Sequence, residues 1–226
     1  MNLSALYSPL VRSLALASGT TSASIGRREA KPATGLLESV LIASAVLPFL
    51  PMLPVQLLIQ NLLYDFSQLS LPWDRMDPEF LTKPRRWDAS GIARFMAFIG
   101  PISSVFDVTT FGLLWFVFGA SSVARQGLFQ SGWLIEGLLS QTLIVHMIRT
   151  KRVPFVQSTA ALPVMLLTTA VMAVGMYVPF SRLRGATGMS RLPWTYFPWL
   201  AVTLLAYGAL TQGVKTWYIR RFHAWL

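Results

Sequence analysis

The sequence predicts an all-α membrane protein, a polytopic bundle of about six transmembrane helices. The first observation is composition: 54% of the 226 residues are hydrophobic and only 12% are charged, whereas a soluble domain usually carries about 25% charged residues. The second is that the apolar residues fall in runs that reach or approach the roughly 20 residues a helix needs to cross a bilayer. Together these observations place the chain in a membrane.

Six stretches qualify, or nearly qualify, as spans. The expected spans are residues 36–50, 53–71, 92–120, 133–148, 160–180 and 196–214. Between the first two lie Pro48, Pro51 and Pro54. Proline removes a backbone donor and disfavours helix in the residue before it, so we expect a tight hairpin corner or a locally unwound helix there. A kink is expected in the third span at Gly100 and Pro101.

The distribution of Lys and Arg predicts the orientation. The sequence has nineteen such residues, and only four fall on one side of the expected spans: Arg125, Arg182, Arg184 and Arg191. The other fifteen lie in the N-terminal region, the C-terminal tail and the loops on the opposite side. Because cytoplasmic loops carry an excess of Lys and Arg, both termini are expected in the cytoplasm. We therefore interpret the net charge of +10 as arising from loops that face anionic lipid and the cytoplasm. We expect no nucleic acid as a partner.

Residues 1–34 differ from the rest of the chain. They are rich in Ser, Ala and Thr, and their longest apolar stretch is too short to span a bilayer. We interpret them as a flexible cytoplasmic extension or a misassigned start, with a targeting leader as the alternative. Residues 35–226 are expected to form the membrane domain.

Several kinds of chemistry are not indicated. The chain has no Cys and only two His, which excludes disulfides and Cys-ligated metals and argues against a His-based metal site. It shows no Walker-type phosphate loop, no Asp-Lys-Thr-Gly-Thr motif and no Ser/His/Asp arrangement. We therefore assign no catalytic and no cofactor-binding residues, and an enzymatic activity of this chain by itself stays an open question.

The candidate site lies in the second span. A carboxylate at the centre of a bilayer helix costs about 2.5–3.5 kcal/mol on insertion scales, so it is a functional candidate by default. Asp65 is the strongest case, and Asn61, four residues earlier, shares its helix face. Tyr64 and Gln68 extend this stripe of oxygen ligands, which suits a hard cation such as Mg²⁺. The alternative is an interhelical hydrogen-bond cluster that only holds the bundle together.

Three other polar residues fall inside expected spans. Glu136 is a possible further contact to the ion path, or a structural carboxylate near the outer interface. For Asp107, in the third span, we expect a buried, hydrogen-bonded role. For His146 we expect a hydrogen-bonded residue at the inner interface and not a metal ligand.

From about residue 36 onwards the sequence closely resembles the C-terminal membrane domain of bacterial magnesium-transporting P-type ATPases. The motifs that carry the resemblance, in order, are Leu-Pro-Phe-Leu-Pro-Met (47–52), Gln-Asn-Leu-Leu-Tyr-Asp-Phe-Ser-Gln (60–68), Leu-Pro-Trp-Asp (71–74), Lys-Pro-Arg-Arg-Trp-Asp (83–88), Phe-Gln-Ser-Gly-Trp (129–133), Glu-Gly-Leu-Leu-Ser-Gln-Thr (136–142) and Tyr-Phe-Pro-Trp-Leu (196–200). The match covers about five sixths of the chain, and residues 1–34 remain unmatched.

The resemblance implies that the six spans are the fifth to tenth of ten family helices, and that Asn61 and Asp65 bind the transported Mg²⁺. In the family, ATP acts through actuator, phosphorylation and nucleotide domains, none of which this sequence shows, so the chain is not expected to pump alone. Its expected partners are the lipid bilayer of the bacterial inner membrane and either the remaining portion of a truncated or split pump or an intact pump. The alternatives are a non-catalytic fragment that binds or regulates an intact pump, and a small secondary transporter.

Overall fold

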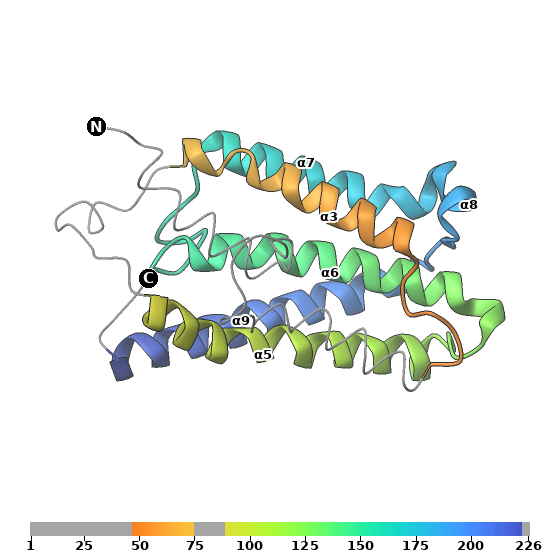
Figure 1. Cartoon of the computed structure of the whole chain (residues 1–226), viewed down its shortest axis with the longest axis horizontal. Coiled ribbons are helices and arrows are strands. Elements are labelled where there is room, and N and C mark those ends of the chain that lie inside the picture. Colours follow the sequence, from red (N-terminus) through yellow and green to blue (C-terminus); the bar gives the residue numbers. More distant parts are fainter. Residues whose placement is uncertain (1–46, 75–88, 223–226) are drawn as a thin grey trace, which may run out of the picture.

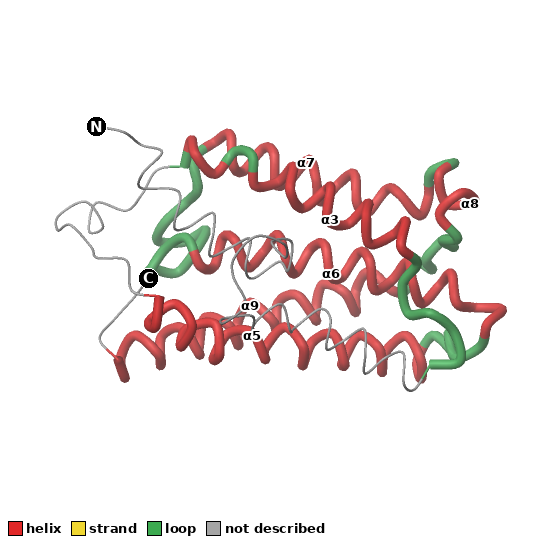
Figure 2. The backbone as a smooth tube through the Cα atoms, in the orientation of Figure 1, coloured by secondary structure: helices red, strands yellow, loops and turns green. Residues whose placement is uncertain are grey.

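The computed structural model describes residues 47–74 and 89–222, with side chains from residue 98 onwards in the second range. Every regular element in these ranges is a helix (Figure 2). The α-helices are α3 (Pro54–Gln68), α5 (Ala89–Gly112), α6 (Gln126–Ile148), α7 (Leu162–Tyr177), α8 (Leu183–Thr187) and α9 (Tyr196–Phe222). The expected extension 1–34 and most of the expected first span lie outside the described residues.

The prediction of an all-helical bundle is confirmed for the described residues, because a helix stands at each of the five expected spans from the second to the sixth. Three of these helices are long and apolar enough to cross a membrane: Phe98–Val117, Leu162–Phe180 and Tyr196–Phe222. The number of six spans stays a prediction.

Helix α6 is the centre of the bundle. It packs against α3, α5, α7 and α9, and Figure 1 shows it between the α3–α7 pair and the α5–α9 pair. Residues on all sides of it are buried, including the polar side chains of Gln130, Glu136 and His146. Because protein and not lipid surrounds α6, its surface does not need to be uniformly apolar.

The boundaries of α6 correct one expectation. The helix begins at Gln126, seven residues before the expected start at Trp133. Glu136 therefore lies near the middle of the helix and not near the outer interface. The hydropathy pattern placed the start too late because the first two turns carry Gln126, Gln130 and Ser131. The polarity of Gln130 and Ser131 is tolerated because both side chains are buried inside the protein.

The proline-rich segment before α3 is unwound, as expected. Residues 47–53 are not helical, and α3 starts with Pro54 in its first turn, where a missing N–H costs nothing. The Gln56 side chain accepts a hydrogen bond from the Leu53 N–H (2.9 Å) and donates to Gln130 Oε1 (3.0 Å). Gln130 in turn donates to the Leu50 carbonyl (2.8 Å). Protein groups thus satisfy an irregular backbone that lipid could not.

Helix α5 runs through Pro101 from Ala89 to Gly112, so the expected kink at Gly100 and Pro101 does not interrupt it. The irregularity comes later, where residues Leu113–Val117 form a π-helical turn. There the Phe118 N–H donates to the Leu113 carbonyl (3.2 Å). The sequence carried no signal for this turn.

The ends of α3, α6 and α9 lie together with the starts of α5 and α7 at one end of the bundle (Figure 1). Here the buried ammonium of Lys215, on α9, donates to the carbonyls of Met147 (3.0 Å), Thr150 (3.2 Å) and Arg152 (2.9 Å). The last carbonyls of a helix lack partners within it and carry partial negative charge. Lys215 therefore caps α6 and fixes the start of the α6–α7 loop.

Close packing between α6 and α7 depends on Gly175. A Cβ atom at this position would overlap Leu138 Cδ2, and Leu138 is fully buried. Small residues at such positions let membrane helices approach closely.

Gly175→Ala should destabilise the chain by about 1–3 kcal/mol, because Leu138 has no space into which it can move. Thermal unfolding in detergent micelles measures this. The matched control is Gly213→Ala on α9, where an added Cβ meets nothing within 4 Å. It should change stability by less than about 1 kcal/mol. Equal effects of the two substitutions would contradict the packing described.

Candidate cation site

Helix α3 separates the predicted ligands into two groups. Its buried face is formed by Gln56, Gln60, Tyr64 and Ser67. Asn61 is half-buried and Asp65 is exposed. Successive residues in a helix are about 100° apart, so Tyr64 turns inward while Asp65, the next residue, turns away from the bundle. The structure thus keeps Asn61 and Asp65 on one face and places Tyr64 on another.

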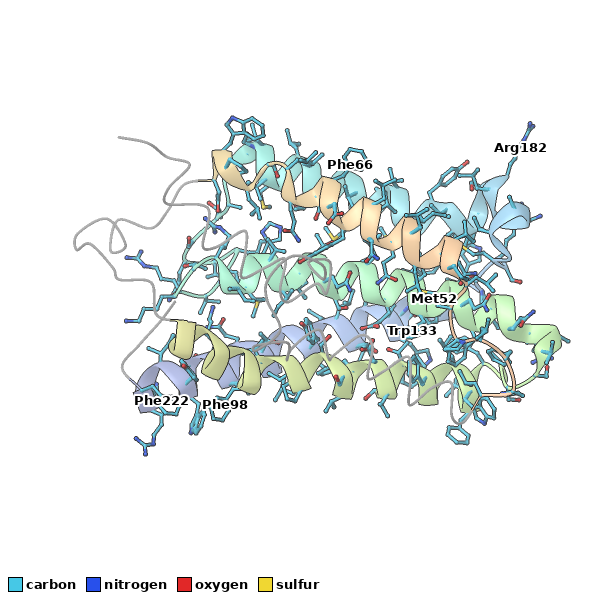
Figure 3. All side chains as sticks on the ribbon, viewed as in Figure 1. Met52, Phe66, Phe98, Trp133, Arg182 and Phe222 are labelled. Carbon is cyan, nitrogen blue, oxygen red and sulfur yellow. The ribbon has the colours of Figure 1, made fainter. Side chains whose placement is uncertain are left out.

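Apart from Asn61 and Gln68, the surface around Asp65 is apolar. Leu62 is 52% exposed and Phe66 48% exposed, and Leu58 and Leu69 belong to the same surface; Figure 3 labels Phe66 on α3. Asp65 makes no hydrogen bond or ion pair with any described residue. A carboxylate among lipid-facing side chains is costly. A cation or a further polar chain segment beside this face would lower that cost.

Gln68 lies at the end of α3, one turn after Asp65. It is half-buried, and its Nε2 atom has no hydrogen-bond partner among the described residues. Its side chain is an amide, so its oxygen can bind a cation while its nitrogen donates elsewhere. Gln68 can therefore join Asn61 and Asp65 at the inner end of their face.

Glu136 belongs to a second polar group, inside the bundle. Its side chain is 1% exposed and its Oε2 atom has no hydrogen-bond partner in the described part of the chain. Gln60 Nε2 donates to Gln141 Oε1 (3.4 Å), while Gln60 Oε1 has no partner among the same residues. The structure does not bring Glu136 to the exposed face of Asp65. Sequence reasoning missed Gln60, although its position four residues before Tyr64 placed it on the same side of α3.

The expected buried, hydrogen-bonded role of Asp107 and the expected hydrogen bond of His146 are confirmed. Asp107 is buried, and its Oδ1 accepts a hydrogen bond from Trp133 Nε1 (3.0 Å). His146 is buried, and its Nε2 is hydrogen-bonded to Thr168 Oγ1 on α7 (3.1 Å). Within the described residues no group of three or more His, Cys, Asp or Glu could hold a metal ion. A cation on α3 would therefore need amide oxygens, water or a further segment.

The end of α3 is fixed by a buried ion pair. Arg149 Nε donates to Asp74 Oδ2 (2.6 Å) and its Nη2 to Asp74 Oδ1 (3.3 Å). The two side chains are 4% and 9% exposed. Asp74 also accepts from the Ala161 N–H (2.8 Å), at the start of α7. The Asp74 carboxylate thus links the segment after α3 to both α6 and α7. It also fixes how far along the bundle the face of α3 with Asn61 and Asp65 lies.

A helical bundle with buried polar side chains on its central helix and apolar outer helices has the features of a polytopic membrane domain. The family model for the C-terminus of cation transporting ATPases matches residues 49–217, and the chain belongs to this family. It corresponds to the C-terminal domain of magnesium-transporting P-type ATPases.

Named relatives support this assignment. The chain is 62% identical to the magnesium-transporting ATPase, P-type 1, of Salmonella typhimurium strain LT2 over 191 residues, which is 84% of this chain and 21% of that protein. It is 57% identical to the protein of the same name from Escherichia coli K12 over 188 residues, which is 83% of this chain and 21% of that protein. The chain therefore spans about a fifth of the length of these relatives.

Asp74→Ala should destabilise the chain by about 3–5 kcal/mol, because it leaves the Arg149 guanidinium buried without its carboxylate. The Asp74→Ala, Arg149→Met double variant should lose clearly less than the sum of the two single losses. Unfolding in detergent, analysed as a double-mutant cycle, measures the difference. Additive losses would show that the pair does not hold the end of α3.

Proposed function

We propose that the chain forms the membrane part of a magnesium-transporting P-type ATPase that imports Mg²⁺, and that Asn61 and Asp65 are ligands of the transported ion. The observation that carries the proposal is the exposed Asp65 carboxylate on an apolar helix face of a family member. The names of its relatives support Mg²⁺ as the ion.

The donor set suits this cargo. Mg²⁺ prefers oxygen ligands, usually one or two carboxylates, and keeps several of its waters. Asp65 supplies a carboxylate, and Asn61 and Gln68 supply amide oxygens. Of the other sequence candidates, Tyr64 and Glu136 face the bundle interior. We therefore centre the site on Asn61, Asp65 and Gln68, where a further segment and water complete the coordination.

Energy for transport must come from elsewhere. The sequence contains no phosphate-binding loop and no phosphorylated-aspartate motif, while the relatives are about five times as long as the region matched. Pumping by this chain alone is therefore not expected. Its partners would be the bilayer and the ATP-hydrolysing portion of a pump.

The proposed location is the bacterial inner membrane with both termini in the cytoplasm. The end of the bundle with Arg149, Lys151 and Arg221 would then face the cytoplasm, which agrees with the usual excess of Lys and Arg on that side. Arg125 and Arg182 lie at the opposite end (Figure 3 labels Arg182).

A second candidate function is a non-catalytic membrane module that binds or regulates an intact pump. The apolar exposed face of α3 favours it, because a helix with a lone carboxylate on this face could pack against a pump helix as well as bind an ion. The experiment below separates the two functions.

A chimaera in which this chain replaces the matching region of the Salmonella relative should restore growth of a magnesium-transport-deficient strain at low Mg²⁺. Asp65→Asn should lower the apparent affinity for Mg²⁺ at least tenfold, which corresponds to about 1.4 kcal/mol of lost binding. Growth and Mg²⁺ uptake against concentration provide the measurement.

The matched control is Leu62→Ala, on the same exposed face one turn earlier, which should leave uptake unchanged. The chain expressed alone should not restore growth. Rescue by the chain alone would overturn the view that it needs a pump portion. Unchanged uptake by the Asp65→Asn chimaera would show that Asp65 is not a ligand of the transported ion. A chimaera that does not restore growth would favour the module that only binds or regulates.

A further inference from the structure

Glu136 is a buried acid that the proposed Mg²⁺ site does not use. It lies near the middle of α6, at the depth where the bundle is surrounded by lipid, and is 1% exposed. An ionised carboxylate at such a place requires a counter-charge or several hydrogen bonds. Its Oε2 atom has neither in the described part of the chain.

Among the described side chains, no basic group faces Glu136 from the packed helices. The titratable groups around it are Asp107 from α5, Tyr196 and Tyr207 from α9 and, next to Tyr207, Tyr64 from α3. The described helix α7 contains no titratable residue before Tyr177.

The two buried basic residues on α6 and α9 are engaged elsewhere. His146 is ten residues from Glu136 along α6, about 15 Å at the usual helical rise, and is hydrogen-bonded to Thr168. Lys215 binds the carbonyls at the end of α6. The described titratable groups that face Glu136 are therefore all neutral or acidic.

Asp107 adds a negative charge close to Glu136. Trp133 donates to Asp107, and Glu136 is one turn after Trp133 on α6, so the two carboxyl groups approach from facing helices. Their negative charges oppose each other. Two carboxylates that share a low-dielectric site do not both ionise readily.

An unsatisfied acceptor lies beside the acid. Gln60 packs against Gly137, the residue after Glu136, and its Oε1 atom has no hydrogen-bond partner among the described residues. A carboxylate cannot donate to this oxygen, because it only accepts. A protonated carboxyl has one O–H to donate, directly or through a water.

We propose that Glu136 is a proton-binding site in the core of the bundle, where one proton is held on the Glu136 carboxyl and donated toward the unsatisfied Gln60 oxygen of α3. The bound proton leaves Glu136 neutral and Asp107 as the charged member of the pair. This inference does not rest on the proposed transport of Mg²⁺, since it depends only on the burial of Glu136, the missing counter-charge among the described residues and the unsatisfied Gln60 oxygen.

Infrared spectroscopy of the whole chain in lipid nanodiscs tests the site, because a protonated carboxyl has a C=O stretch distinct from that of a carboxylate. The wild-type chain should show this band at neutral pH. Glu136→Gln should remove it, while the matched substitution Asp74→Asn, at an ion-paired carboxylate, should leave it. Absence of the band in the wild type, or its persistence in Glu136→Gln, overturns the proposal.

Asp107→Asn provides a second test that does not require Glu136→Gln to fold. Removing the neighbouring charge should let Glu136 release its proton more readily, so the band should disappear at a lower pH than in the wild type. Loss of the band at all pH values would show that the proton is held by Asp107 instead, and would overturn the assignment.

Mg²⁺ distinguishes a proton site from a metal site. If Glu136 holds a proton, Gln is a neutral isostere, and the effect of added Mg²⁺ on the unfolding temperature should be the same in the wild type and in Glu136→Gln. A Mg²⁺-dependent stabilisation that Glu136→Gln abolishes would identify a metal ligand and overturn the proposal.

Discussion

The structure depends on the burial of most of α6 by four neighbouring helices. This enclosure lets one helix carry Gln130, Glu136, Ser140 and His146 through the depth of a membrane, because side chains and not lipid solvate them. The same enclosure keeps the residues before α3 in place, since Gln130 holds the Leu50 carbonyl. The outer helices can then be apolar toward lipid, and three of them are.

The sequence predicted the fold better than the site. Runs of apolar residues located α5, α7 and α9, and the prolines at 48, 51 and 54 located the unwound segment before α3. The start of α6 was predicted too late because hydropathy measures contact with lipid, and α6 has little. The π-helical turn at Leu113–Val117 was not predicted, since residues 113–117 contain no glycine or proline that would indicate a break in the helix.

For the site, a spacing of four residues grouped Asn61 with Asp65 correctly, but it could not tell which face of α3 was inside. Tyr64 was placed on the same stripe, and in the structure it turns inward. Which of two polar faces is buried depends on the neighbouring helices, and a single amphipathic stretch does not identify them. The role of Asp74 could not be predicted from the sequence, because it depends on Arg149 and Ala161, which only the fold places beside it.

The cap on α6 has a consequence for the order of assembly. Lys215 is more than sixty residues later in the chain than the carbonyls it binds. As a ribosome releases the chain from the N-terminus, α6 and the loop after it are inserted well before α9 exists. Until α9 is made, the carbonyls at the end of α6 lack the Lys215 ammonium that later binds them. The polar side chains of α6 that face α9 likewise lack some of the protein groups that later surround them. Of the described helices, the one made last is therefore the one that completes the surroundings of α6.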